Sequence, residues 1–344
     1  MSHDQFEVLS NQAVAACAVV YFLALLTHLA QWAVERKVPA TEAAAGVPER
    51  VGSGAGSGVA AGVGSGANAP VATASAPPAS YDDSGDVEER ADRFGRIGVA
   101  LTIVAVAVHF VAVVARGLAA DPVRVPWGNM YEFTLTGTFV VAAGYLLLYR
   151  KFSLSWLAPV VTGFVLVTLM ADVLLLYSPV SPLRDALQSP WLIIHVVAAI
   201  IATGAFTIGG MASVLYLVKE RWLAKGGAQR GGHGYLARLP GLAALDRVAY
   251  RTQAFAFPVW TFAALIAGPI WAKHAWGSYW GWDPKEVWAF ITWVVYAAYL
   301  HARATAGWRG RAAAIVALVG LATLWFNFIG INFFFGSGSM HSYA

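Results

Sequence analysis

Long apolar runs restrict the possible folds of this chain more than any other feature. A helix needs about 20 predominantly apolar residues to cross the hydrocarbon core of a bilayer. By this rule we expect about eight transmembrane helices, at residues 11–34, 97–115, 131–149, 154–176, 190–218, 253–272, 284–303 and 312–334. With 58% hydrophobic and only 12% charged residues, the composition is typical of a polytopic membrane protein. The sequence therefore predicts an all-α polytopic membrane fold.

Basic residues are unevenly distributed between the two sides of this predicted membrane protein. Most of the 23 Lys and Arg residues fall in loops on one side. The opposite side carries only Arg116, Arg124, Arg184, Lys273 and Lys285. By the positive-inside rule the basic side is cytoplasmic, so we expect both termini outside. The basic residues are explained by topology and require no nucleic-acid partner.

Composition divides the chain into three parts. Residues 1–37 hold the first predicted transmembrane helix. Residues 38–95 are a Gly/Ala/Ser/Pro tract followed by an acidic cluster that consists of Asp82, Asp83, Asp86, Glu88, Glu89 and Asp92. The tract lacks the large apolar side chains that a core needs, so we expect a disordered cytoplasmic linker. Residues 96–344 hold the other helices, so we expect one bundle of about seven helices with an external segment at 274–288.

Cysteine usage excludes several kinds of chemistry. Cys17 is the only cysteine, and it lies inside the first predicted helix. Disulfides, CxxC redox chemistry and self-attachment of a c-type haem are therefore excluded. Any thiols used in a reaction on this protein must come from another molecule.

The external segment "WGSYWGWDPKEVW" (276–288) concentrates aromatic and charged residues. Asp283, Pro284 and Glu286 match a capping box at the start of a helix, which accounts for them without any ligand. The tryptophans have two explanations: an interfacial aromatic belt, or a platform on which a flat conjugated ligand stacks. On the second interpretation, Lys285 or Arg124 can bind carboxylates of the ligand.

Two histidines are expected on the same outer side of the membrane as this segment. His195 lies about a turn and a half into the helix that begins at Ser189 and Pro190, near the outer surface. His341 follows the last predicted helix, also outside. Two such imidazoles can hold the iron of a haem through neutral ring nitrogens. The alternatives are an interfacial hydrogen-bonding role for His195 and no role for His341.

The other intramembrane histidines have less definite roles. His301 lies about 25 Å along its helix from Pro284, near the cytoplasmic end. It is either an interfacial residue beside Arg303 or a second ligand station on the inner side. His28 and His109 also lie within predicted helices, without an evident partner, and His274 adjoins the tryptophan segment.

Several segments together resemble one family. The tryptophan segment resembles the WWD signature of haem-handling proteins of cytochrome c biogenesis, and among these the chain resembles the CcsA (ResC) family of system II, called CcsB in actinobacteria. "PWGNMYEF" (126–133), "SPWLIIHV" (189–196), "LHAR" (300–303) and "MHSYA" (340–344) resemble family landmarks in the family's order. The resemblance covers the chain from about residue 97 to its end.

The resemblance implies a haem-handling subunit of a cytochrome c synthase (haem lyase) complex in the bacterial plasma membrane. It implies that haem b is held transiently at an extracytoplasmic site, with His195 and His341 as axial ligands and His301 serving haem on the inward side. The cradle would then consist of Trp276, Gly277, Tyr279, Trp280, Trp282, Asp283, Lys285, Glu286 and Trp288.

Partners follow from the same resemblance. It implies a ResB-type membrane partner, apocytochrome c as the recipient of haem, and a thiol-disulfide reductant that supplies a reduced CxxCH segment. The thiols of that segment would add to the haem vinyl groups and form two thioethers.

Two rival functions differ in their demands on the sequence. An electron-transfer cytochrome b-type membrane protein needs histidine pairs at matching depth on facing helices, and His109 is the only other outer-half candidate to pair with His195. A solute transporter, with the tryptophan segment as an aromatic gate, predicts no haem on purification and no dependence on His195.

Overall fold

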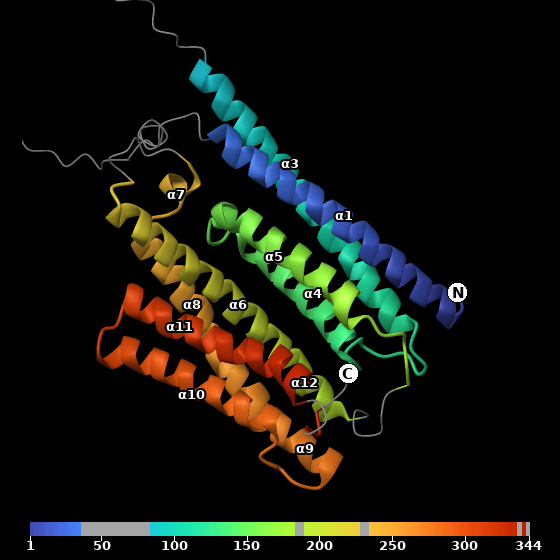
Figure 1. Ribbon diagram of the computed structural model, residues 1–344. Helices are drawn as coiled ribbons and strands as arrows, with labels where there is room; N and C mark the ends of the chain where they lie inside the picture. The colour runs from blue at the N-terminus through green and yellow to red at the C-terminus, as the bar shows by residue number, and fades with distance from the viewer. Residues whose placement is uncertain (36–82, 183–188, 228–233, 336–338, 342–344) are drawn as a thin grey trace, which may run out of the picture.

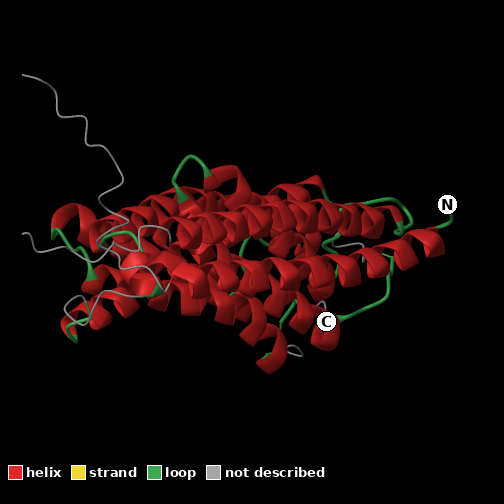
Figure 2. Ribbon diagram, turned by 90° about the horizontal axis from the view of Figure 1, so that it is seen from above, coloured by secondary structure: helices red, strands yellow, loops and turns green. Residues whose placement is uncertain are grey.

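A computed structural model describes residues 1–35, 83–182, 189–227, 234–335 and 339–341, and within them the chain forms helices and loops but no strand (Figures 1 and 2). Seven helical segments in this part of the chain are long and apolar enough to cross a membrane. The predicted all-α polytopic membrane fold is thus confirmed. The remaining expected segment forms α10 (Pro284–Thr305), a helix of 22 residues that is not one of the seven.

The first half of the bundle is built on an antiparallel pair of long helices. Helices α1 and α3 pack along each other, α1 packs on α5, and α3 packs on α4 (Figure 1). The elements of this half are α1 (His3–Glu35), α3 (Asp83–Leu118), α4 (Met130–Tyr149), the 3₁₀ segment η1 (Leu154–Leu157), α5 (Ala158–Ala171) and the π-helical segment η2 (Asp172–Leu176).

The second half is centred on α6, which packs against α4, α8 and α11 and so joins the two halves. Helix α10 packs mainly on α11. The elements are α6 (Pro190–Ala224), α7 (Tyr235–Arg238), α8 (Leu242–Thr261), the π-helical η4 (Phe262–Ala267), α9 (Gly268–Trp276), α10, α11 (Arg311–Trp325), the π-helical η5 (Phe326–Gly330) and α12 (Ile331–Phe334).

The N-terminus, residues 339–341 and the α9–α10 connection lie toward the same end of the bundle, at the lower right and bottom of Figure 1. We call this the site end. Helices α6 and α8 extend beyond the apolar runs expected at 190–218 and 253–272, toward the opposite end. That opposite end carries the basic connection between α6 and α8. We keep the prediction that it faces the cytoplasm.

The C-terminal part of the predicted linker 38–95 is helical. Helix α3 begins at Asp83, so most of the acidic cluster lies on its first turns. Glu89 and Arg93, one turn apart, form an exposed ion pair of 2.9 Å that supports this helical extension. The prediction of disorder at 83–95 was wrong because Glu, Arg and Ala there favour helix. Residues 36–82 of the linker lie outside the described residues.

Capping side chains fix where the helices begin at the site end. Ser189 accepts a hydrogen bond from the Trp191 amide and Pro190 opens α6. Asp283 accepts from the Lys285 amide, while Glu286 accepts from the Asp283 amide at 3.2 Å. The capping box predicted for α10 is therefore confirmed. The start of each helix positions the functional side chains that follow it.

A buried ionic cluster ties α1, α3 and α4 together at the site end. The guanidinium of Arg116 donates to Glu132 and Glu7, at 3.3 Å in each case. Arg124 donates to Glu132 at 2.6 Å. Arg116 and Glu132 are fully buried, so each charge depends on its partners in place of water. The cluster fixes the N-terminal end of α4, which forms part of the site.

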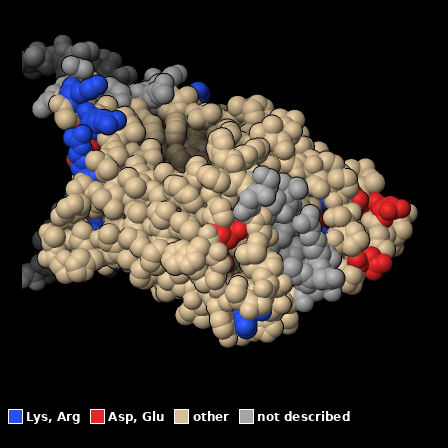
Figure 3. All heavy atoms as spheres, turned by 60° about the horizontal axis from the view of Figure 1, so that its bottom comes forward, with Lys and Arg blue, Asp and Glu red and all other residues tan. Residues whose placement is uncertain are grey.

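The surface is consistent with a membrane environment. In the view of Figure 3, charged side chains gather mainly toward the ends of the molecule, with a wide uncharged surface and a hollow between them. Large apolar side chains such as Leu147, Val167 and Leu174 are exposed over most of their area. In water this exposure would favour aggregation, whereas lipid tails cover it without cost.

Candidate functional site

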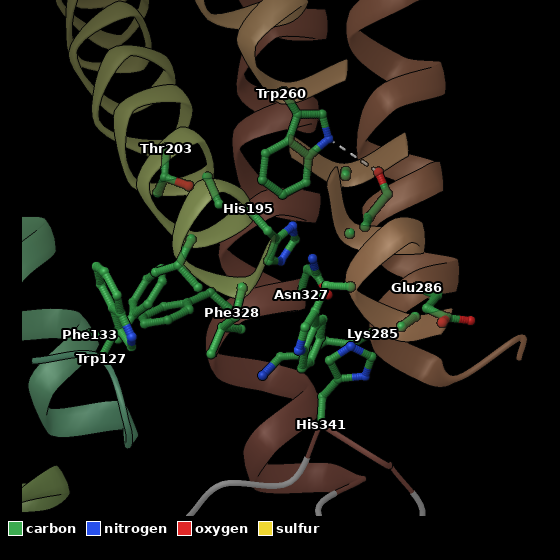
Figure 4. Close-up of a pocket in the computed structure, with 18 of the residues that line it drawn as sticks. Trp127, Phe133, His195, Thr203, Trp260, Lys285, Glu286, Asn327, Phe328 and His341 are labelled. Carbon is green, nitrogen blue, oxygen red and sulfur yellow. Dashed lines mark hydrogen bonds between the residues drawn. The ribbon is translucent and has the colours of Figure 1, made fainter. Parts of the chain in front are cut away.

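A cavity at the site end is lined by several candidate residues from the sequence, among them His195, Lys285 and His341 (Figure 4). It encloses about 1130 Å³, part of which is open to solvent, and it lies between α4, α6, η4, α9, α10 and η5. Its aromatic walls include Trp127, Phe133, Trp260, Trp271, Trp280 and Phe328. Its polar lining consists of Asn129, His195, Thr203, Lys285, Glu286, Asn327 and His341. A mostly aromatic lining with a few polar groups is suited to a flat, mostly apolar ligand.

The imidazole of His195 points into this cavity from α6 (Figure 4). Its Nδ1 lies 2.8 Å from the carbonyl oxygen of Ala263 and therefore carries the proton and donates. In this tautomer the lone pair is on Nε2. A backbone carbonyl that holds Nδ1–H is the usual way in which proteins orient a histidine for metal coordination.

The π-helical turn η4 presents the Ala263 carbonyl to His195. Within η4 the Gly268 amide donates to Ala263, the wide hydrogen bond of a π-helix. Gly268 has no side chain where one would collide: a Cβ there would lie 3.1 Å from Nδ1 of His195 and 3.2 Å from the Ala263 oxygen. A π turn followed by a glycine thus leaves room for the imidazole against the helix backbone.

The second cavity histidine is held by a carboxylate. His341 Nδ1 lies 3.1 Å from Oδ1 of Asp283, the N-cap residue of α10. The tail is fixed to the same carboxylate by the Ser339 hydroxyl at 2.9 Å and the Met340 amide at 2.6 Å. The imidazole ring of His341 also packs edge-on against Trp276, with ring centroids 4.6 Å apart. Asp283 therefore positions His341 as Ala263 positions His195.

The charge state of Asp283 follows from these contacts. Burial alone would raise its pKa, but hydrogen bonds from His341, the Lys285 amide and Ser339 outweigh it and lower the pKa to about 2. The carboxylate is thus ionised at any physiological pH. An ionised partner strengthens the hydrogen bond to the imidazole and raises the basicity of its other nitrogen.

The nine residues expected to form the cradle divide into two groups. Trp280, Lys285 and Glu286 line the cavity. Asp283 acts through His341, and Trp276 packs on the same ring. These five lie at or next to the cavity.

The other four lie away from the cavity lining. Tyr279 and Trp282 are 59% and 72% exposed. Gly277 ends α9 in the left-handed conformation, at φ +80°, and Trp288 packs on Phe326, with ring centroids 4.2 Å apart. Trp282 also has a positive φ of 57°, an uncommon conformation for a bulky residue. The turn it makes directs its ring away from the interior.

Other histidines of the described residues do not line the cavity. His301 is exposed at the opposite end of α10, where its neighbour Arg303 pairs with Asp246 at 2.7 and 2.9 Å. His109 is buried and contacts the Leu135 carbonyl at 3.0 Å. His28 is buried beside Thr102, and His274 is exposed and bonded to its own helix at Ile270.

Several cavity residues were not found from the sequence. Trp260 comes from α8 and donates from its indole to the Ala289 carbonyl of α10 at 3.3 Å (Figure 4). Asn327, in η5, has a buried Oδ1 without a hydrogen-bond partner. An asparagine inside the last apolar run was a usable signal, because polar groups within a membrane are costly unless they have a function.

Comparisons with known proteins agree on one family. The chain matches the family described as Cytochrome C assembly protein over residues 127–337. It is 36% identical over 229 residues to the cytochrome c biogenesis protein CcsA of Chlamydomonas reinhardtii, covering 64% of this chain and 61% of that protein. It is 33% identical over 304 residues to CcsA of Synechococcus sp. (strain JA-3-3Ab), covering 73% of this chain and 84% of the relative.

The fold is similar to that of a solved structure. The cytochrome c heme lyase CcmF superimposes with a TM-score of 0.60 at 16% sequence identity, over 95% of this chain and 47% of that chain. This chain therefore spans about half the length of CcmF, and less than two thirds of the algal CcsA. At this identity the likeness to CcmF shows a common fold alone.

Proposed function

Because this chain belongs to the cytochrome c assembly protein family, and within it to the CcsA proteins of system II cytochrome c biogenesis, we propose that it is the haem-handling subunit of a cytochrome c synthase. Its role is in cytochrome c maturation. It receives haem b, holds it transiently in the cavity at the site end, and presents it on the extracytoplasmic face of the membrane for attachment to apocytochrome c.

The pair of oriented histidines carries this proposal. His195 and His341 line one cavity, and each ring uses Nδ1 to contact an oxygen of the protein. Both rings are thereby set to offer Nε2 to a metal. No group of three or more His, Cys, Asp or Glu side chains in the described residues could hold a metal ion. Two oriented histidines suit a metal that arrives with its own ligands, as iron does in haem.

The cavity walls fit the rest of the molecule. Haem is flat, apolar over most of its surface and charged at its two propionates. Aromatic side chains such as Trp271 and Trp280 suit its faces, and Lys285 suits its carboxylates. His195 lies nearly parallel to Trp271, with an interplanar angle of 15°. Stacking and apolar contact hold a ligand without a covalent bond, as transient binding requires.

The reaction needs positioning more than it needs a catalytic group. Each thioether forms when a cysteine S–H of the substrate adds across a haem vinyl group; the sulfur bonds to one carbon, the proton goes to the other, and nothing is lost. Holding the vinyl groups beside the thiols makes the addition effectively intramolecular. Cys17 is buried in α1 and does not compete. The substrate thiols must be kept reduced by a separate reductant.

Release of the product requires that one histidine leaves the iron. The histidine of the CxxCH segment replaces it. His341 is the more easily displaced ligand, because it belongs to a short tail held by contacts to one carboxylate, whereas His195 is part of a long helix. A ResB-type membrane protein completes the complex.

His301 is assigned a separate role. By its position on α10 it belongs to the end of the bundle opposite the cavity, and it is exposed. We propose that it serves haem on the inward side. His28 and His109 are packed against neighbouring helices, where they contact Thr102 and Leu135, and they line none of the described pockets, so the cytochrome b alternative gains no support.

The test is the absorption spectrum of the full-length protein purified in detergent, alone and with a ResB-type partner. Wild type should show bis-histidine haem, and His195→Ala and His341→Ala should each weaken it and impair cytochrome c maturation. His274→Ala, which removes an exposed histidine near the same segment, is the control. An unchanged haem spectrum in both cavity variants would refute the site. Cytochrome c maturation at the wild-type level in His341→Ala would refute the displacement order.

A further inference from the structure

Lys285 is a cation without an acidic partner in the cavity wall. Its ammonium donates to Oδ1 of Asn332 at 3.0 Å, a neutral group, and it forms no ion pair with any described residue. Glu286 is engaged by the Gly281 and Asp283 amides, and Asp283 is engaged by the tail. An ammonium has three donors, so Lys285 retains donors for a ligand. A cation in a mostly apolar cavity is costly unless an anion accompanies it.

Asn129 supplies a second donor without a partner. Its Oδ1 accepts from the Glu132 amide at 2.8 Å and caps α4, which fixes the orientation of the side-chain amide. The other half of that amide, Nδ2, is buried and has no hydrogen-bond partner. The residue is 9% exposed and lines the cavity. A buried N–H group without an acceptor indicates that a ligand supplies one.

The two donors belong to one region of the wall. Asn332, which accepts from Lys285, donates in turn to the sulfur of Met130 at 2.9 Å, and Met130 directly follows Asn129. This is also the N-terminus of α4, a helix of 20 residues, whose dipole adds a partial positive charge. The three features attract the same kind of group: an anion with several acceptor oxygens.

Arg124, the other carboxylate partner considered from the sequence, is committed elsewhere. Its guanidinium donates to Glu132 at 2.6 Å and to the Ser181 carbonyl at 3.1 Å, and it does not line the cavity. Binding a ligand would require Arg124 to leave a buried carboxylate, which is costly. Lys285 is therefore the cation of this site.

We propose that Lys285 and Asn129 form a carboxylate subsite that binds a propionate of the haem and thereby sets which edge of the porphyrin is held by the protein. The subsite rests on the haem-handling function proposed above. Haem carries both propionates on one edge and both vinyl groups on the opposite edge. Anchoring the propionate edge at α4 and α10 directs the vinyl edge away from these residues, toward the incoming thiols.

The experiment compares haem with its dimethyl ester, in which both carboxylates are blocked. The full-length protein in detergent is titrated with each, and binding is followed by the Soret band. Wild type should bind haem at least about tenfold more tightly than the ester, the change expected when a charge-assisted hydrogen bond is lost. Lys285→Gln should lose this preference, because its affinity for haem should fall while its affinity for the ester stays the same.

Asn129 is tested with two variants that keep the helix cap. Asn129→Asp caps α4 equally well but replaces the donor with an anion, and Asn129→Ser keeps a cap without the amide. Both should reduce the preference for haem over its ester, the aspartate more strongly. Lys273→Gln is the control, because Lys273 is exposed and bonded to the Gly277 carbonyl. Thermal unfolding of each variant reports on folding.

The outcomes separate this proposal from the function on which it rests. Equal binding of haem and ester by wild type, with no effect of Lys285→Gln, would overturn the subsite while the histidine site stands. Binding of neither compound by wild type would overturn both. A haem preference that persists in Asn129→Ser but disappears in Lys285→Gln would remove Asn129 from the subsite.

Discussion

Replacing Gly268 with alanine tests whether the turn beside His195 determines how that ring is held. The new Cβ would lie 3.1 Å from Nδ1 of His195 and 3.2 Å from the carbonyl oxygen of Ala263, the two atoms of the orienting hydrogen bond. These separations are tighter than ordinary contacts, so the ring or the carbonyl must move by a few tenths of an ångström. Nε2 of His195, the nitrogen proposed to bind iron, is not among the three atoms nearest to the new Cβ.

The expected loss can be worked from that contact. A neutral hydrogen bond contributes roughly 1 kcal/mol, about a fivefold change in a binding constant. The imidazole must also turn, and loss of a partner that orients a metal ligand typically costs about 10–100-fold in affinity. We therefore expect haem to bind about tenfold more weakly to Gly268→Ala.

The assay is a Soret titration of the purified full-length protein, with thermal unfolding measured in parallel. Gly144→Ala in α4 is the matched control, because a Cβ there meets no atom within 4 Å. Both substitutions favour helix by up to about 1 kcal/mol, so neither should lower stability through propensity. Wild-type haem affinity in Gly268→Ala would refute the view that this hydrogen bond positions His195.

Three further predictions concern other parts of the site end. Asp283→Asn keeps an N-cap for α10 but loses the charge that holds His341, so haem should transfer to apomyoglobin about tenfold faster. Because folding lowers the Asp283 pKa from 3.8 to about 2, its stabilisation should be complete above pH 4 and lost as the pH falls through 2. Acid unfolding curves that coincide for wild type and Asp283→Asn would contradict this stabilisation by the Asp283 carboxylate. Trp282→Gly should leave haem affinity unchanged and relieve the positive φ, whereas Trp280→Ala should weaken binding; the reverse order in a Soret titration would place the Trp282 ring at the ligand. Glu132→Gln should cost about 3 kcal/mol in denaturant unfolding, because two arginines lose a buried partner, while Arg93→Gln in the exposed pair should cost under about 0.5 kcal/mol; equal effects would mean that burial of the cluster is unimportant.

Helices and their starting points were accessible from the sequence because their causes are local. Apolar run length identifies a membrane helix, and a capping residue such as Ser189 or Asp283 acts within one turn. The position of His195 and His341 at the same end of the bundle also followed from counting residues, whereas their meeting at one cavity did not. The length of α3 was missed because the acidic cluster was interpreted by its charge rather than its helix propensity.

Contacts between distant residues were not accessible. The bond of His341 to Asp283 joins residues far apart in the sequence, and that of His195 to Ala263 depends on a π turn that no composition signal marks. Clustering of tryptophans in the sequence did not reveal which rings face inward. Gly277 and Trp282 both turn the chain through positive φ, so neighbouring rings separate into exposed and cavity-lining positions.

The wide turn at Phe262–Ala267 has a consequence for insertions and deletions. A π turn accommodates one more residue than the α-helix around it, so deleting a single residue there would restore a regular helix without breaking it. The residues that follow, Trp271 among them, would keep about the same face of the helix, because the π turn already absorbs the extra residue. The Ala263 carbonyl would be drawn into the regular α-helical hydrogen bonds and away from His195. A homologue with a one-residue gap at this point would keep the span and need another acceptor to orient its histidine.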